Sequence, residues 1–123
     1  MPPKQVRNAS TTRARILEKA TDIFAQSGYD GASIGDIVKV SKVNKRMIYH
    51  YFGDKEGLYR AIFRQQWGEL KDWFDRSIKD RLDSGIPLPA DPKGLLIESL
   101  LVASDFMAGN QRFVSLVMWE GLE

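Results

Sequence analysis

The chain has 123 residues, 43% of them hydrophobic, which is enough for one compact domain or for a small module with part of a second, but not for two full domains. It contains no cysteine, which excludes disulfides, a thiol nucleophile and a thiolate metal site and favours a reducing compartment such as the cytoplasm. No apolar stretch follows the basic residues near the start, and no apolar run reaches the roughly 20 residues of a membrane span, so neither a secretory signal nor a membrane segment is expected.

The net charge of +2 hides an uneven distribution along the chain. Residues 1–60 contain 11 Lys and Arg against 6 Asp and Glu, a net charge of +5, whereas residues 61–123 contain 7 against 10, a net charge of −3. A basic N-terminal half is the electrostatic footprint of phosphate binding, although many ordinary domains carry a similar bias. The charge distribution alone therefore identifies no function.

Helical periodicity runs through most of the first half. After a flexible polar arm over residues 1–10, apolar residues at helical spacing predict a first helix that stops at Gly28. Ser33, with Asp36 three positions later, is the N-cap candidate of a short second helix. After a tight connection, Asn44 is the N-cap candidate of a short third helix.

The second half continues the helical pattern. Asp54 is expected to cap a long fourth helix that reaches about Asp83 as one element, although a glycine interrupts its pattern. Residues 84–92 are rich in proline and glycine and predict a loop, which is followed by helices over residues 93–108 and 112–122. No stretch alternates between apolar and polar residues for long enough to form a strand, and there are no internal repeats. The predicted fold class is all-α.

A helical wheel, at about 100° per residue, divides the third helix into two faces. One face is cationic and aromatic and carries Lys45, Arg46, Tyr49 and His50; the other is mainly apolar and carries Met47, Ile48, Tyr51 and Phe52. A helix of this kind has the diameter to enter the DNA major groove, with its N-terminal residues nearest to the base edges. If this helix stood alone, a solvated charged face would be the simpler interpretation.

The neighbouring segments carry candidates for contact with a phosphate backbone. The second helix, the tight turn and the third helix form a helix-turn-helix pattern, and several predicted helix starts would converge on one DNA backbone. The polar and basic residues at these starts are Thr11, Thr12, Arg13, Arg15, Ser33 and Lys55. Capping or solvation explains each of them equally well on its own, so their joint placement supports the DNA-binding interpretation.

Three motifs make a family resemblance specific: the Gly-Tyr-Asp-Gly turn at residues 28–31, the Ile-Tyr-His-Tyr-Phe block at 48–52 and the Asp-Lys-Glu-Gly-Leu start of the fourth helix at 54–58. With the sequence around them, residues 14–63, they resemble the TetR-type (TetR/AcrR) transcriptional regulators. By position, the resemblance implies base reading by Lys45, Arg46 and Tyr49, with His50 near the groove edge. It implies phosphate contacts from Ser33, Asn44, Tyr51 and Lys55, beside the Thr12 and Arg13 named above.

Two positions depart from the family pattern. Lys42 stands in the turn where the family commonly has a glycine, and a φ angle above zero is uncommon for a lysine, so the turn is expected to be strained. Gly35 stands at a second-helix position that reads a base in some members. Its lack of a side chain shifts base reading to the third helix.

The resemblance also implies a domain organisation. A helix-turn-helix DNA-binding domain is expected over residues 1–54, and the long fourth helix joins it to an incomplete ligand-binding and dimerisation domain over residues 55–123. Because members of the family are usually longer, the chain is expected to be a fragment or a short form with apolar surface that is normally covered. Candidates for the wall of a ligand pocket are Trp67, Leu70, Phe74, Leu101, Phe106 and Trp119, and core packing is the alternative for each.

The function implied is that of a sequence-specific transcriptional regulator, most simply a homodimeric repressor that an unidentified small-molecule effector releases from a pseudo-palindromic operator in double-stranded DNA. The alternative is a helical protein-interaction module that binds an acidic partner through its basic face. An enzyme is disfavoured, because His50 is the single histidine and no glycine-rich phosphate loop or nucleophile elbow is present. Neither a metal nor a cofactor is expected.

Overall fold

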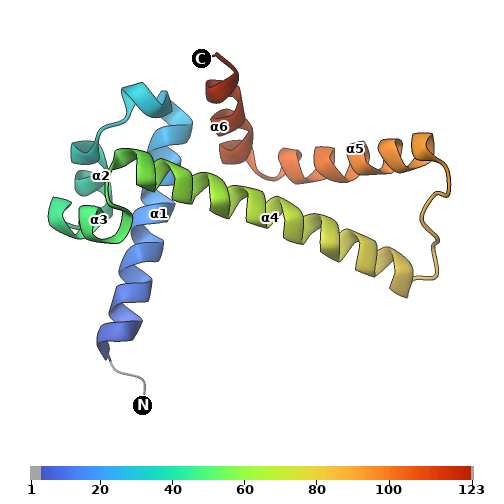
Figure 1. Ribbon diagram of the computed structural model, residues 1–123, viewed down its shortest axis with the longest axis horizontal. Coiled ribbons are helices and arrows are strands. Elements are labelled where there is room, and N and C mark those ends of the chain that lie inside the picture. The colour runs from blue at the N-terminus through green and yellow to red at the C-terminus, as the bar shows by residue number, and fades with distance from the viewer. Residues whose placement is uncertain (1–3, 123) are drawn as a thin grey trace.

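The computed structural model describes the backbone of residues 4–122 and the side chains of residues 11–121. The described chain is all-α, as predicted, with the helices α1 (Lys4–Gly31), α2 (Ile34–Ser41), α3 (Lys45–Phe52), α4 (Lys55–Asp83), α5 (Pro92–Ala108) and α6 (Gln111–Leu122). Residues 4–10, expected to belong to a flexible arm, are helical, and residues 1–3 of that arm lie outside the described residues. Helices α1–α3 gather at one end of the molecule, α4 and α5 extend away from it, and α6 returns to α1 (Figure 1).

The helix starts follow the capping residues that the sequence indicated. In each case a side-chain oxygen accepts a hydrogen bond from the backbone N–H three positions on, which satisfies one of the free donors of the first turn. The donor–acceptor distances are 3.1 Å at Ser33, 2.8 Å at Asn44 and 2.7 Å at Asp54. Asp91 caps α5 in the same way, at 2.9 Å. The predicted second, third and fourth helices therefore begin where local hydrogen bonding starts them.

The α1–α3 region, called here the N-terminal module, is built round one apolar core. Its fully buried side chains include Ile16 and Phe24 of α1, Ile37 of α2, Ile48 of α3 and Leu58 of α4. Burial of one such side chain stabilises the fold by about 1.5–3 kcal/mol. Leu116 of α6, with 1% of its surface exposed, belongs to the same core. The core thus joins the first turns of α4 and the last helix to the module.

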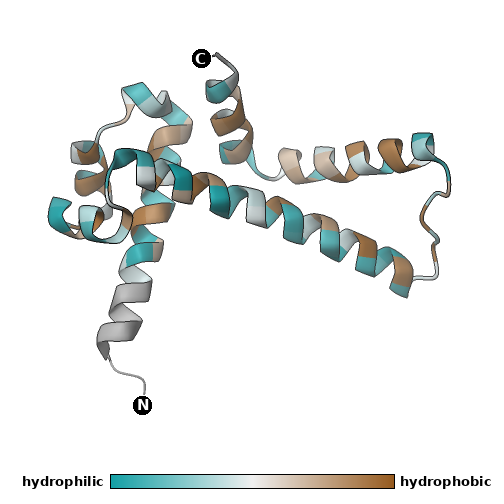
Figure 2. Ribbon diagram, in the orientation of Figure 1, coloured by the Kyte–Doolittle hydropathy of each residue, from teal (hydrophilic) through white to brown (hydrophobic). Residues whose placement is uncertain are grey.

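The other end of the molecule is more open. Helix α4 remains one continuous helix to Asp83, as predicted. Helix α5 is rich in apolar residues (Figure 2). Many of them are exposed. Arg81 of α4 donates to a carboxylate oxygen of Glu98 in α5 at 2.6 Å and to the carbonyl of Pro87 in the loop, so polar contacts join the two helices near the loop. None of the described helices has the length and apolar character required to cross a membrane.

Candidate nucleic-acid interface

Helix α3 presents one polar face to solvent and packs the other against the module. Lys45, Arg46 and His50 are exposed, and Tyr49 is 39% exposed. Ile48 is fully buried in the core, and Met47, Tyr51 and Phe52 are half-buried. These exposures agree with the two faces predicted from the helical wheel. The packed face holds the helix on the module and leaves the cationic face free to meet a partner.

The turn before α3 contains the one residue other than glycine with positive φ in the described chain. Lys42 has φ 58° and ψ 29°, the left-handed conformation, and its N–H donates to the carbonyl of Val38 at 2.9 Å. Ser41 is buried, and its hydroxyl accepts a hydrogen bond from the N–H of Val43 at 3.3 Å. Lys42 therefore adopts the strained conformation that was expected, and this left-handed turn joins α2 to α3 in a short connection.

The predicted base readers are spread along the exposed face of α3, with Lys45 and Arg46 in its first turn. The ammonium group of Lys45 lies 5.8 Å from the ring centroid of Tyr49, one turn further on, which is within reach of a cation–π interaction. Arg46 is exposed beside them. His50 lies in the last turn of the helix, and its ring meets that of Tyr51 edge-on at 5.4 Å between centroids.

Two residues predicted to contact phosphate are held by aromatic rings. The guanidinium carbon of Arg13 in α1 lies 5.0 Å from the ring centroid of Phe52, which brings this exposed arginine beside the end of α3. The ammonium group of Lys55, in the first turn of α4, lies 4.3 Å from the ring centroid of Tyr29. The exposed Ser33 and Asn44 cap their helices, while Thr12 is half-buried in α1.

The hydroxyl of Tyr29 lies in an environment that keeps it neutral. Burial raises the pKa of Tyr29, and the negative charges of Glu56, Asp54 and Asp30 raise it further. A tyrosine hydroxyl is already neutral at pH 7, and the raised pKa favours that form further, so the ring that Lys55 meets is neutral. The sequence marked this tyrosine as part of the Gly-Tyr-Asp-Gly turn but assigned no role to it.

Gly35 and Arg64 are two further features of the interface. Gly35 is exposed in the first turn of α2, where an added Cβ would meet nothing nearer than the hydroxyl of Ser33 at 3.7 Å, so this part of the surface stays flat.

A recess of about 360 Å³ between α1 and α4 is lined by Arg13, Leu17, Ala61, Arg64 and Gln65. No sequence motif marks Arg64, because only the crossing of α1 and α4 brings it to the same recess as Arg13.

The six candidates for a ligand pocket do not gather round one cavity. A cavity of about 330 Å³ lies between α4 and α5, and Phe74 is the one candidate that lines it, with Ile78, Arg81, Leu95, Glu98 and Val102 among the other lining residues. Phe106 is buried against Trp73 and Phe113. Trp67 meets Phe113, Leu70 is half-buried and Leu101 is 56% exposed. The contacts of Phe106 with these two rings are those of core packing, which was the alternative interpretation for this residue.

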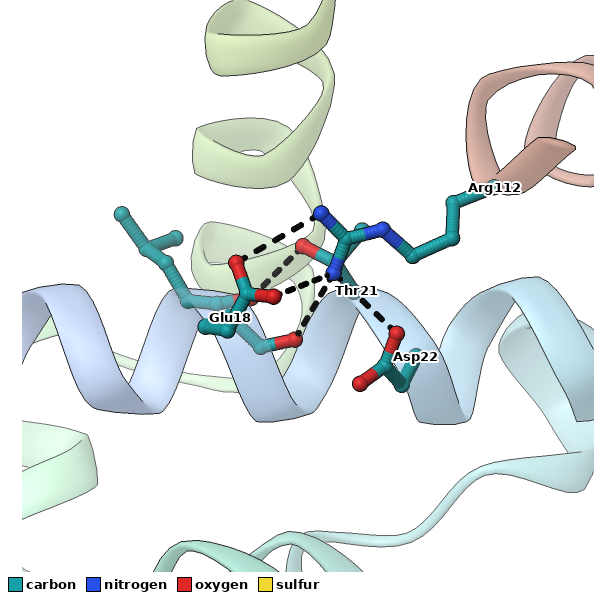
Figure 3. A network of polar contacts seen from close by, with 5 residues as sticks. Glu18, Thr21, Asp22 and Arg112 are labelled. Carbon is teal, nitrogen blue, oxygen red and sulfur yellow. Dashed lines mark hydrogen bonds and ion pairs between the residues drawn. The ribbon is translucent and has the colours of Figure 1, made fainter. Parts of the chain in front are cut away.

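Trp119, the sixth candidate, belongs to a contact between α6 and α1. Its indole N–H donates to the carbonyl of Ala25 at 2.9 Å. At the start of α6, the guanidinium group of Arg112 reaches carboxylate oxygens of Glu18 at 2.8 Å and Asp22 at 3.1 Å (Figure 3). Helix α6 therefore contacts α1 of the N-terminal module both near the start of α6, through Arg112, and near its end, through Trp119. Trp119 does not line the cavity between α4 and α5.

An exposed cationic helix that follows a tight turn and is seated on two supporting helices defines a protein of the helix-turn-helix class. Residues 16–62 match the model of a family described as bacterial regulatory proteins, tetR family. The region over residues 16–62 is thus a domain of this family, which confirms the resemblance seen in the sequence motifs.

Several curated proteins are similar to the chain over most of its length. The HTH-type transcriptional repressor SCO4008 of Streptomyces coelicolor is 33% identical over 119 residues, which cover 95% of this chain and 53% of the relative. The HTH-type transcriptional repressor NicS of Pseudomonas putida is 31% identical, over 96% of this chain and 52% of the relative. The HTH-type transcriptional regulator UidR of Escherichia coli is 40% identical, over 93% and 54%. The chain spans about half the length of these relatives.

Proposed function

We propose that the whole protein is a sequence-specific DNA-binding transcriptional repressor. The observation that carries this proposal is the seating of α3, in which Ile48 is fully buried while Lys45 and Arg46 are exposed on the opposite side. The names of two relatives, both transcriptional repressors, support repression as the outcome of DNA binding. The protein acts in the cytoplasm, as a regulator and not as an enzyme.

In this proposal α3 enters the major groove, and its first turn reads bases. Arg and Lys side chains can donate to the O6 and N7 atoms of guanine, which suits Lys45 and Arg46, and Tyr49 and His50 contact the groove further along. The helix starts contact the backbone: Ser33, Asn44 and Lys55, with Thr12 and Arg13 of α1 and the hydroxyl of Tyr51, meet phosphate oxygens. These contacts set the register of the helix on the duplex, while base contacts discriminate between sequences.

The regulatory step requires two copies of the protein. A symmetric homodimer would bind a pseudo-palindromic operator whose half-sites lie about 34 Å apart, one turn of DNA. A small-molecule effector that binds beside α4 and favours another spacing of the two modules would release the operator. The cavity between α4 and α5, lined by Phe74 and Arg81, supports a site for such an effector. The contacts of α6 with Glu18 and Ala25 of α1 offer a route from that region to the module.

The test is to select binding sequences for the whole protein from a random DNA library and to measure affinity over a range of salt concentrations. A pseudo-palindromic site should emerge, and affinity should fall steeply as salt rises. Replacement of Lys45 or Arg46 should relax the preference at one base pair and weaken specific binding by about 1–3 kcal/mol. Replacement of Lys55 should weaken binding to all sequences alike.

The matched control is Lys71→Gln, which removes an exposed cation of α4 that pairs with Asp75 and lies outside the proposed interface. This variant should bind DNA as the wild type does. If the intact dimer binds no DNA even at low salt, the proposal fails. The basic face would then be better explained as a docking site for an acidic protein partner.

A further inference from the structure

Lys55 has an unusual place for a cation. It is the first residue of α4, where the positive end of the helix dipole makes a positive charge unfavourable. Its ammonium group lies 4.3 Å from the ring centroid of Tyr29, and none of the ion pairs between described residues includes it. A cation within about 6 Å of an aromatic centroid is attracted by the negative face of the ring. The ring of Tyr29 therefore offsets part of the unfavourable dipole.

The ring of Tyr29 is itself held firmly. It stacks on Phe24, which is fully buried, with 6.1 Å between centroids and 15° between planes. It meets Tyr59 edge-on at 4.9 Å. The hydroxyl of Tyr59 donates to a carboxylate oxygen of Glu120 in α6 at 2.5 Å, so the cluster is anchored on both α4 and α6. The ring on which Lys55 rests is consequently packed against the core and held by aromatic contacts.

A lysine side chain is flexible, and an ordered contact with DNA requires it to give up rotamer freedom. A side chain that the protein already holds near its bound orientation loses less of that freedom on binding. The half-buried Lys55 meets this condition, because the ring of Tyr29 confines its ammonium group beside the start of α4. A tyrosine hydroxyl is neutral at pH 7, and the raised pKa of Tyr29 favours that form further, so this contact is between a cation and a neutral ring.

We propose that Tyr29 is a positioning residue for DNA binding: its ring holds the ammonium group of Lys55 in the orientation in which it meets a phosphate. The inference rests on the proposed function, in which Lys55 contacts the DNA backbone. It adds a role for a residue that does not touch DNA itself. The ring face carries this role, and the hydroxyl group does not.

The first part of the test needs no DNA. Ring currents shift protons that lie over an aromatic face upfield, so the ε-methylene protons of Lys55 should be shifted in the NMR spectrum of the wild type. Tyr29→Phe keeps the ring and should keep the shift, whereas Tyr29→Leu should abolish it. Phe63→Leu is the matched control, because Phe63 packs on Tyr59 at 4.9 Å in the same cluster and is not the ring beneath Lys55. It should leave the shift of Lys55 in place.

The second part measures DNA binding by the whole protein over a range of salt concentrations. Lys55→Gln should make the negative slope of log K against log salt shallower by about 0.9 for each module. It should also weaken binding about eightfold per module at 0.1 M salt. Tyr29→Leu should weaken binding about two- to fivefold per module, the effect of one exposed cation–π contact. Tyr29→Phe should match the wild type. In the Lys55→Gln background, Tyr29→Leu should have no further effect.

Each of the following outcomes contradicts either the positioning role of Tyr29 or the proposed function. An unshifted Lys55 in the wild type, or a Tyr29→Leu effect of the same size with and without Lys55, overturns the positioning role and leaves the proposed function intact. If the wild type shows the ring-current shift but binds no DNA, the proposed function fails and the positioning role fails with it. If DNA binds and Lys55→Gln changes neither affinity nor slope, Lys55 is not a phosphate contact and the inference is wrong.

Discussion

The indole ring of Trp119 in α6 occupies the space that any side chain at Gly28 of α1 would need. A Cβ added at Gly28 would lie 2.9 Å from Cε3 of the indole ring, and real Cβ atoms do not approach other atoms so closely. Gly28 also has φ 75° and ψ 176°, a backbone conformation that essentially only glycine adopts. Gly28 was predicted to end the first helix, but it bends α1, which continues to Gly31. Its lack of a side chain also leaves room for Trp119 of α6.

Gly28→Ala should therefore destabilise the chain for two reasons. The backbone conformation costs about 1–3 kcal/mol for a residue with a Cβ, and the overlap with Trp119 adds about 1–3 kcal/mol. Gly85→Ala is the control, since Gly85 has the same φ of 75° and an added Cβ there meets nothing within 4 Å. Urea unfolding should show the larger loss for Gly28→Ala. Equal losses would mean that the contact with Trp119 contributes nothing.

Arg112→Gln should weaken the attachment of α6 to α1. The guanidinium group contacts Glu18 and Asp22, and because these groups are partly exposed, the loss should be about 1 kcal/mol and smaller at high salt. Arg60→Gln removes an exposed ion pair within α4, with Glu56, and should change the free energy of unfolding by less than about 0.5 kcal/mol. If the two variants unfold alike in urea at low salt, the contact between the helices has no special stabilising role.

Lys42→Gly should stabilise the N-terminal module. Lys42 has φ 58°, and glycine adopts this conformation without the steric penalty of about 1 kcal/mol that a residue with a Cβ carries. Lys39→Gly, which places glycine within α2, should destabilise the fold by about 1 kcal/mol, while removing the same charge. Opposite signs in thermal or urea unfolding are the expected result. Destabilisation by both changes would contradict the assignment of strain to Lys42.

Substitutions at Asn44 should separate capping from DNA contact. Asn44→Ala removes the oxygen that accepts from the N–H of Met47, and the fold should lose about 1 kcal/mol. Asn44→Asp keeps that acceptor and adds a negative charge favourable at a helix start, so the stability should be retained. The same charge should weaken DNA binding by the whole protein, because it would face phosphate groups. DNA binding by Asn44→Asp at the wild-type level would remove Asn44 from the interface.

The parts of the fold that sequence reasoning predicted depend on interactions between near neighbours. Ser33, Asn44 and Asp54 each bond to a backbone N–H three positions on, so the side chain and its partner lie in the same short segment. The two faces of α3 follow from helical geometry alone. The left-handed conformation of Lys42 could be expected because the family that the chain resembles commonly has a glycine at this position of the turn. Most of the candidate interface was predictable because it belongs to these short helices.

The ligand-pocket candidates were less predictable. Periodicity shows that Phe106 and Trp119 belong to an apolar face, but it does not show which neighbour that face meets. In the structure, Phe106 packs among aromatic rings of α4 and α6, and Trp119 bonds to α1. Phe74 alone of the six candidates lines the cavity between α4 and α5.

The sequence by itself determined that the chain is helical, where α2, α3 and α4 begin, and the cationic face of α3, because capping and amphipathicity act within a few residues. The tertiary structure alone decided that Arg112 and Trp119 would hold α1 and that Tyr29 would lie beneath Lys55. Arg112 and Glu18 are 94 positions apart, and their meeting depends on the path of α4, the loop and α5 between them. That path is set by how apolar surfaces pack in three dimensions, which no local pattern specifies.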